Sequence, residues 1–194
     1  MSLEGHELEL IAADGQPVDP VRGDNIVIGT AERYDFLVTL KESGSFTLHA
    51  AALGSTKQAI GVVHTRDVPA KASRTRPPFS GRSIGSADYA SLRSPYPTTL
   101  PEGPVKTFDI KLGGEMKKYL WSINGEYYPE LFSPDGKAEP LWIRSGERVR
   151  VRISNPTMMY HPMHLHGHFF RLLRKPGDWS DPMAPMKDTV IVWP

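Results

Sequence analysis

Cysteine is absent from the 194 residues of this chain. Its absence excludes disulfides, zinc–thiolate sites, thiol catalysis and any copper–thiolate centre made by this chain alone. An excess of charge of one sign is also lacking, because the formal net charge is only +1. Nucleic acid, an anionic membrane or an acidic substrate is therefore not expected as the main partner. No apolar run approaches the ~20 residues that span a bilayer, and no signal-peptide core stands at the N-terminus.

Long stretches with a helical period are missing as well. Short apolar, β-branched runs separated by Gly, Pro and Asp turns dominate instead, and they predict an all-β chain. The strands are expected within residues 6–13, 25–29, 32–40, 45–52, 58–65, 105–114, 117–125, 140–154, 163–175 and 187–194.

The strand runs fall into two groups, separated by a change in composition. Residues 66–104 are rich in Pro, Ser and Arg and are expected to form an irregular linker, with one short helical turn near "SADYASL". We therefore predict a unit at 1–65, the linker at 66–104 and a second unit at 105–194, both sandwich-like.

The strand "RVRVRIS" alternates arginine with aliphatic residues. Alternation places Arg148, Arg150 and Arg152 on one face of a strand and the aliphatic side chains on the other. We interpret the arginines as a solvated outer face rather than as an anion site, since half-buried strands normally have this pattern.

Histidine is concentrated in one place. The stretch "HPMHLHGH" holds His161, His164, His166 and His168, four of the seven histidines in the chain. Pro162 favours extended backbone before it, and the following alternation is typical of a strand. In a strand, His164, His166 and His168 would share one face and His161 would lie on the other.

This parity predicts two metal sites rather than one three-histidine cage. His164 and His166 would be ~6.6 Å apart at their Cα atoms. They could converge on one ion or serve two adjacent ions. His161 would serve a different site across the strand, and Gly167 would allow a close approach of backbone or ligand.

The alternative is a strand with buried histidines that satisfy one another or the backbone. Several neutral imidazoles desolvated together are costly without a partner, so metal binding is the favoured interpretation. With nitrogen ligands only, the candidate metals are copper, zinc, nickel and iron. His6, His49 and His64 match no ligand pattern.

The segment "HPMHLHGHFF" resembles the first copper-binding motif in the last domain of multicopper oxidases, the group of laccases, bilirubin oxidases and bacterial copper-resistance oxidases. The flanks "LWSINGEYYPE", "SGERVRVRISNPTMMY" and "APMKDTVIVWP" resemble the strands around that motif. The stretch "LIAADGQPVDPVRGDNIVIGTAERYDFLVTL" is similar to the later half of the middle domain. The resemblance implies cupredoxin-like Greek-key β-sandwich units, a partial one at 1–65 and a nearly complete one at 105–194.

The resemblance also implies roles for single residues. His161 would ligate the type 1 copper, His164 the type 2 copper and His166 one of the type 3 pair, whereas His168 is usually not a ligand. In the family, electrons from a reducing substrate enter at type 1 copper and pass to the trinuclear cluster, where dioxygen is reduced to water. Family habit further implies a periplasmic or extracellular location.

The family pattern contains parts that this chain lacks. The His-Cys-His motif, which supplies the type 1 thiolate, and the first domain are missing. We therefore expect a piece of an oxidase that is not competent alone. Two alternatives remain: a non-catalytic copper-sequestering module, aided by Met158, Met159 and Met163, and a metal-free β-sandwich remnant. Unpaired strand edges predict self-association or pairing with the missing fragments.

Overall fold

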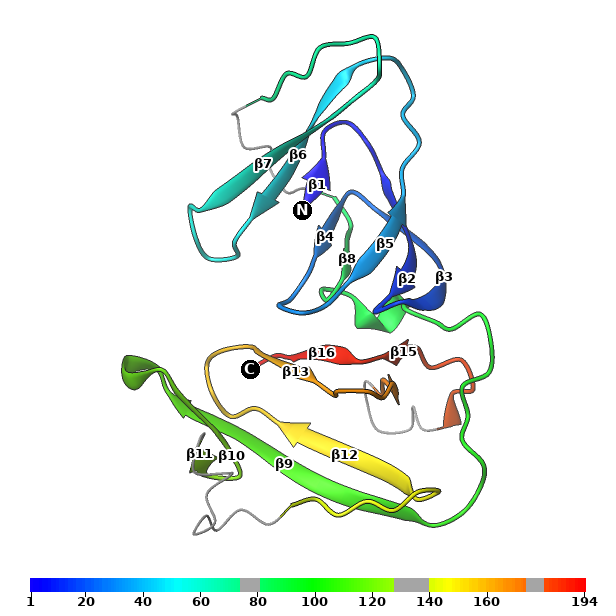
Figure 1. Ribbon diagram of the computed structural model, residues 1–194, viewed down its shortest axis with the longest axis vertical. Coiled ribbons are helices and arrows are strands. Elements are labelled where there is room, and N and C mark those ends of the chain that lie inside the picture. Colours follow the sequence, from blue (N-terminus) through cyan, green and yellow to red (C-terminus); the bar gives the residue numbers. More distant parts are fainter. Residues whose placement is uncertain (74–80, 128–139, 174–179) are drawn as a thin grey trace. The chain divides into compact units, whose positions relative to one another are not determined.

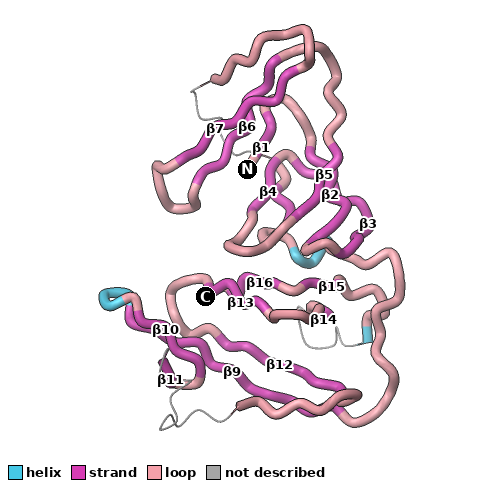
Figure 2. The backbone as a smooth tube through the Cα atoms, in the orientation of Figure 1, coloured by secondary structure: helices cyan, strands magenta, loops and turns pink. Residues whose placement is uncertain are grey.

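Strands dominate the computed structural model, which describes residues 1–73, 81–127, 140–173 and 180–194 (Figures 1 and 2). The helical elements are short 3₁₀ turns, such as η1 (Tyr89–Ser91) and η2 (Met116–Lys118). The all-β prediction is thus confirmed. Within the described residues, no helix has the length and apolar character needed to cross a membrane. The strands are β1 (Ser2–Leu3), β2 (Leu8–Ala13), β3 (Gln16–Gly23), β4 (Asn25–Val27), β5 (Tyr34–Leu37), β6 (Ser45–Ala51), β7 (Gln58–His64), β8 (Ser83–Gly85), β9 (Val105–Glu115), β10 (Leu120–Ile123), β11 (Glu126–Tyr127), β12 (Arg148–Ser154), β13 (His161–His164), β14 (Phe170–Arg171), β15 (Met186–Lys187) and β16 (Thr189–Val192).

The chain divides into two compact units. Unit 1 contains Met1–Thr99 and His164–Val190, and unit 2 contains Leu100–Met163 and Ile191–Pro194. This division differs from the boundaries expected from the sequence, because the segment 164–190 packs with the N-terminal residues. The boundaries at 65 and 105 stay a prediction. Parts of the expected linker, of the flank "GEYYPE" and of the run "FFRLLRK" lie outside the described residues.

Unit 1 is built from small sheets around one apolar core. Its sheets have the orders β1-β6-β7 and β3-β2-β5, with the pairs β4-β8 and β14-β15 beside them. Alternate residues at the start of β2 point inward, so that Leu8 and Leu10 are buried while Glu9 between them is only partly covered. The core is completed by Leu3, Ala13, Val18, Val21, Ile26, Tyr34, Ile84 and Leu92.

Part of the expected linker belongs to this core. β8 pairs in parallel with β4, and Ile84 and Leu92 are fully buried. The predicted helical turn is present as η1. Residues 81–94 are therefore an element of unit 1 rather than an irregular connection, because two apolar anchors outweigh the polar, proline-rich composition around them.

Unit 2 contains a sheet of order β11-β10-β9-β12. β12 runs parallel to β9, and its register places Arg152 opposite Asp109. These two side chains form a bidentate ion pair with distances of 2.6 and 2.7 Å. The expected solvated arginine face holds for Arg152 but not for the whole strand, since Arg148 and Arg150 are half-buried and Val151 is 46% exposed.

Candidate metal centre

The histidine segment is a short strand followed by a turn. β13 ends at His164, and the turn that follows contains His166 and Gly167. The expectation of one strand through His168 is therefore wrong. Gly167 has a φ of +72°, which favours glycine, and a Cβ there would meet nothing within 4 Å. Its role is to turn the chain rather than to admit another backbone.

The imidazole of His164 has one nitrogen committed to hydrogen bonding. Its Nδ1 lies 3.0 Å from the carbonyl oxygen of Asp188 and 2.9 Å from Oγ1 of Thr189. A carbonyl oxygen can only accept, so Nδ1 carries the proton and donates it. The Thr189 hydroxyl donates to the Asp188 carboxylate at 2.8 Å and presents a lone pair to the ring. In the neutral ring, Nε2 of His164 is therefore the nitrogen with the free lone pair, and it is the one that can bind a metal ion.

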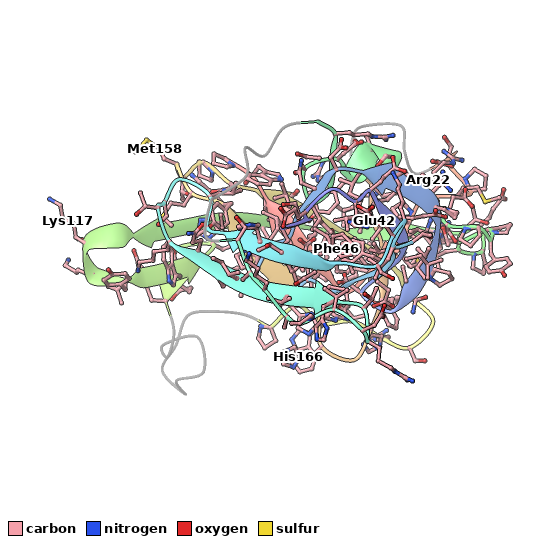
Figure 3. All side chains as sticks on the ribbon, turned by 90° about the horizontal axis from the view of Figure 1, so that it is seen from above. Arg22, Glu42, Phe46, Lys117, Met158 and His166 are labelled. Carbon is pink, nitrogen blue, oxygen red and sulfur yellow. The ribbon has the colours of Figure 1, made fainter. Side chains whose placement is uncertain are left out.

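His166 lies beside this ring although it stands in the turn. The ring centroids of His164 and His166 are 4.9 Å apart, with the planes tilted by 53°. His164, His166 and His168 are all exposed, and Figure 3 shows the side chain of His166 at the outside of the drawn chain. The alternative of a strand with buried, mutually satisfied histidines therefore does not fit these three residues.

His161 is held differently, from its own side of the strand. In β13 it has the opposite parity to His164. Its Nε2 lies 2.8 Å from Oγ1 of Thr157, whose hydroxyl donates to Oδ1 of Asn155 at 2.6 Å. The hydroxyl thus accepts from Nε2–H and leaves Nδ1 unprotonated. Trp121 packs edge-on against the ring at 5.4 Å, and burial lowers the pKa of His161, which keeps the imidazole neutral at neutral pH.

The imidazoles of this segment are suitable ligands for copper, but within the described residues too few ligands come together for a complete site. A neutral imidazole with a free lone pair is a good copper ligand, and the rings of His164 and His166 lie side by side. Across residues 1–73, 81–127, 140–173 and 180–194, however, no group of three or more His, Cys, Asp or Glu side chains is arranged to hold a metal ion. Since the chain has no cysteine, a blue centre also lacks its thiolate here.

A cluster of charged residues supports His164 and was missed by sequence reasoning. The guanidinium of Arg33 binds both carboxylate oxygens of Asp188, at 2.7 and 2.6 Å. These hydrogen bonds lower the pKa of Asp188 to about 2. Asp14 accepts the backbone N–H groups of Asp188 and Thr189, and the buried ammonium of Lys187 lies 3.0 Å from the same carboxylate.

The remaining histidines do not join this group. His6 packs edge-on against Phe46 at 4.4 Å, His49 is buried in β6, and Nδ1 of His64 contacts the carbonyl oxygen of Val68 at 2.8 Å. Met158, by contrast, projects from the ribbon in Figure 3 and is 95% exposed.

Comparison with known proteins points to one family. Two family models, both described as multicopper oxidase, match residues 102–194 and 1–67. The multicopper oxidase MmcO of Mycobacterium tuberculosis is 37% identical over 194 residues, which are 100% of this chain and 36% of that protein. The copper resistance protein A homolog of Pseudomonas syringae pv. tomato is 40% identical over 88 residues, covering 45% of this chain and 13% of its own length.

A likeness in structure extends over the whole chain. The McoA multicopper oxidase of Aquifex aeolicus matches with a TM-score of 0.61 and 22% identity, over 100% of this chain and 42% of that chain. At this identity the likeness shows the fold, and it confirms the cupredoxin-like all-β class. The present chain spans little more than a third of the length of MmcO.

Proposed function

Because this chain belongs to the multicopper oxidase family, we propose that it carries part of the copper centres of an oxidase. The whole enzyme would couple one-electron oxidation of a reducing substrate to reduction of dioxygen to water. The observation that supports this proposal most directly is the pair of adjacent rings, His164 and His166, with Nε2 of His164 free to bind a metal ion.

The proposal assigns three ligands. His161 would bind type 1 copper through Nδ1, His164 would bind type 2 copper through Nε2, and His166 would bind one copper of the type 3 pair. Copper, when bound, supplies reversible one-electron transfer between its two oxidation states. The protein residues orient the imidazoles: Thr157 holds His161, and the Asp188 carbonyl holds His164.

This chain alone should bind copper weakly and without colour. The blue absorption needs a sulfur ligand, and the sequence has no cysteine to provide one. We expect the purified 194-residue chain to take up Cu(II) and to give an electron paramagnetic resonance spectrum with nitrogen coupling. No intense blue band and no turnover of an oxidase dye should accompany it.

Three alanine variants test the ligand assignment. His164→Ala and His166→Ala should each weaken Cu(II) binding at least tenfold, because each removes one of two adjacent donors. His168→Ala is the matched control, since this exposed imidazole lies in the same segment and is not assigned as a ligand. Equal affinity of all three variants, or a blue chain, would contradict the assignment.

A second candidate function is copper sequestration without catalysis. It is favoured by the exposure of Met158, whose thioether suits Cu(I) and which stands three residues before the start of β13. A sequestering module would retain Cu(I) stoichiometrically under reducing conditions, and Met158→Ala would lower that retention. Retention that depends on the histidines alone favours the oxidase proposal.

We also propose that the chain associates with other chains. Large apolar side chains are exposed in unit 2, among them Trp142 at 75% and Trp121 at 43%. Exposed apolar area of this kind marks association surfaces. Sedimentation velocity at two concentrations should show association, and a monomer at both would contradict it. A location in the periplasm or outside the cell, implied by the family, is testable by fractionation of the source cells.

A further inference from the structure

The dipeptide Asp188–Thr189, which holds the ring of His164, is itself fixed from behind. Oδ2 of Asp14 accepts the backbone N–H of Asp188 at 3.2 Å and that of Thr189 at 3.1 Å. Arg33 binds the Asp188 side chain through two nitrogens. The carbonyl oxygen of Asp188 therefore faces His164 while the neighbouring N–H groups and the carboxylate are held by residues of the N-terminal segment.

Asp14 and Arg33 also hold each other. The backbone N–H of Arg33 donates to Oδ1 of Asp14 at 3.0 Å, and the guanidinium lies 3.4 Å from the same oxygen. The carboxylate of Asp14 is fully buried, and its backbone has a φ of +52°. A non-glycine residue in this region of φ is uncommon and is sustained by its surroundings. Here the turn aims both carboxylate oxygens at separate sets of N–H donors.

We propose that Asp14 and Arg33 are positioning residues for His164. By fixing Asp188–Thr189, they hold the proton of His164 on Nδ1 and present Nε2 to the metal ion. His164 lies in the matched segment 102–194, whereas Asp14 and Arg33 lie in the matched segment 1–67. Residues of one matched segment thus orient the candidate metal ligand of the other. The inference rests on the proposed role of His164 as a copper ligand, but its structural half can be measured without metal.

The variants are chosen to separate positioning from general stability. Arg33→Gln removes the bidentate contact at a side chain that is 49% exposed, so the fold should tolerate it. Asp14→Asn leaves a single acceptor oxygen, so one of its two donor sets faces an amide NH₂ instead. Arg152→Gln is the matched control, because Arg152 forms an equally short bidentate pair with Asp109 in unit 2. His164→Ala identifies the copper bound at this site.

Two readouts are used on the 194-residue chain at one pH. Long-range ¹H–¹⁵N correlation of the metal-free chain reports which nitrogen of His164 carries the proton, and calorimetric titration with Cu(II) ions reports affinity. The wild type and Arg152→Gln should show Nδ1–H at His164 and equal Cu(II) affinity. Arg33→Gln and Asp14→Asn should show a mixture of the two tautomers and Cu(II) binding weaker by about tenfold.

The outcomes distinguish the two proposals. If the wild type binds no Cu(II), the copper proposal fails, while the tautomer comparison still decides the positioning proposal. If Arg33→Gln keeps the Nδ1–H tautomer and wild-type affinity, positioning is overturned and the copper proposal stands. A loss of urea resistance in Arg33→Gln with no change in tautomer indicates a merely structural ion pair, and it too overturns positioning. Should Asp14→Asn fail to fold, Arg33→Gln alone carries the test.

Discussion

Lys187 has an unusual environment for an ammonium group, and this leads to a large expected effect on stability. Its side chain is fully buried, with Nζ 3.0 Å from the carboxylate of Asp14 and 3.4 Å from that of Glu32. The same nitrogen lies over the ring of Tyr34 at 4.6 Å. Burial raises the pKa of the Tyr34 hydroxyl above its usual range, so this phenol stays neutral and donates to Glu32 at 3.0 Å.

Replacement of Lys187 by methionine would remove the buried cation but keep most of the side-chain volume. Two buried carboxylates would then lose the positive charge between them, and breaking a buried ion pair in this way costs about 3–5 kcal/mol of unfolding free energy. The cavity contribution should be small, since methionine is unbranched and adaptable. For a chain of this size, each kcal/mol lowers Tm by ~2–4 °C, so the expected decrease is about 6–20 °C.

Thermal and urea unfolding of Lys187→Met measure this effect. Lys118→Met is the control, because Lys118 and Glu115 form an exposed pair at 2.9 Å and should contribute less than about 0.5 kcal/mol. The double variant Lys187→Met with Glu32→Gln should recover part of the loss, since one uncompensated charge is removed. A Lys187→Met chain as stable as the wild type would refute the assignment of these groups as a buried charged cluster.

Two further predictions concern unit 1. Gly85→Ala should lower the free energy of unfolding, measured with urea, by about 2–5 kcal/mol, because φ is +76° and the new Cβ would lie 2.6 Å from the carbonyl oxygen of Val27. Gly5→Ala is the control: φ is +71° but the space around it is open, so this variant should lose only about 1 kcal/mol. Hydrogen bonds from Thr47 lower the pKa of Glu4, so its contribution to stability is fully present above the unfolded value near 4.5 and is lost as pH falls through the lower folded pKa. The stability difference between wild type and Glu4→Gln should be about 1 kcal/mol at pH 7 and shrink as the pH falls below that unfolded value, and a difference that stays constant in acid would contradict this.

The strands could be predicted well where apolar periodicity is local, as in β2, β6 and β9. β3 was missed because Pro17 and Pro20 argue against a strand. The structure places β3 at the edge of the sheet β3-β2-β5, where a residue without an N–H group is tolerated. Edge position depends on which strands pair, and pairing between distant segments is not contained in a local pattern.

The segment 81–94 shows a second limit of composition. Proline, serine and arginine suggested a connection, yet Ile84 and Leu92 are completely buried. A few apolar anchors suffice to fold a polar segment onto an existing core, since each buried aliphatic side chain contributes ~1.5–3 kcal/mol. Composition averages over the segment and therefore conceals them.

The candidate site was predictable as far as the motif is local. The spacing of His161, His164 and His166 identified the imidazoles, and parity separated His161 from His164. The end of the strand was not anticipated, because Gly167 was interpreted as room for a neighbour rather than as a turn. The adjacency of the rings of His164 and His166 therefore arises from a turn, although the sequence predicted it from a strand.

The supporting charges could not be found in the same way. Arg33 and Asp188 are 155 residues apart, and Asp14 and Thr189 are 175 apart. Each of these charged residues looks like a solvated surface residue in its own stretch of sequence. Lys187, which is followed by Asp188 and Thr189, gives no local signal of its burial either.

His161 and His164 also differ in which residues fix the tautomer of the ring, and thus in which residues decide the nitrogen that keeps a free lone pair. The tautomer of His161 depends on Thr157, four residues earlier, and so belongs to the local sequence. The tautomer of His164 depends on Asp188, whose orientation depends in turn on Arg33 in the other matched segment. A substitution in residues 1–67 that leaves every histidine in place can therefore change the nitrogen that His164 presents, whereas His161 should be insensitive to it. The candidate ligands are identified by local sequence in this chain, but the orientation of the His164 ring is a property of the folded unit.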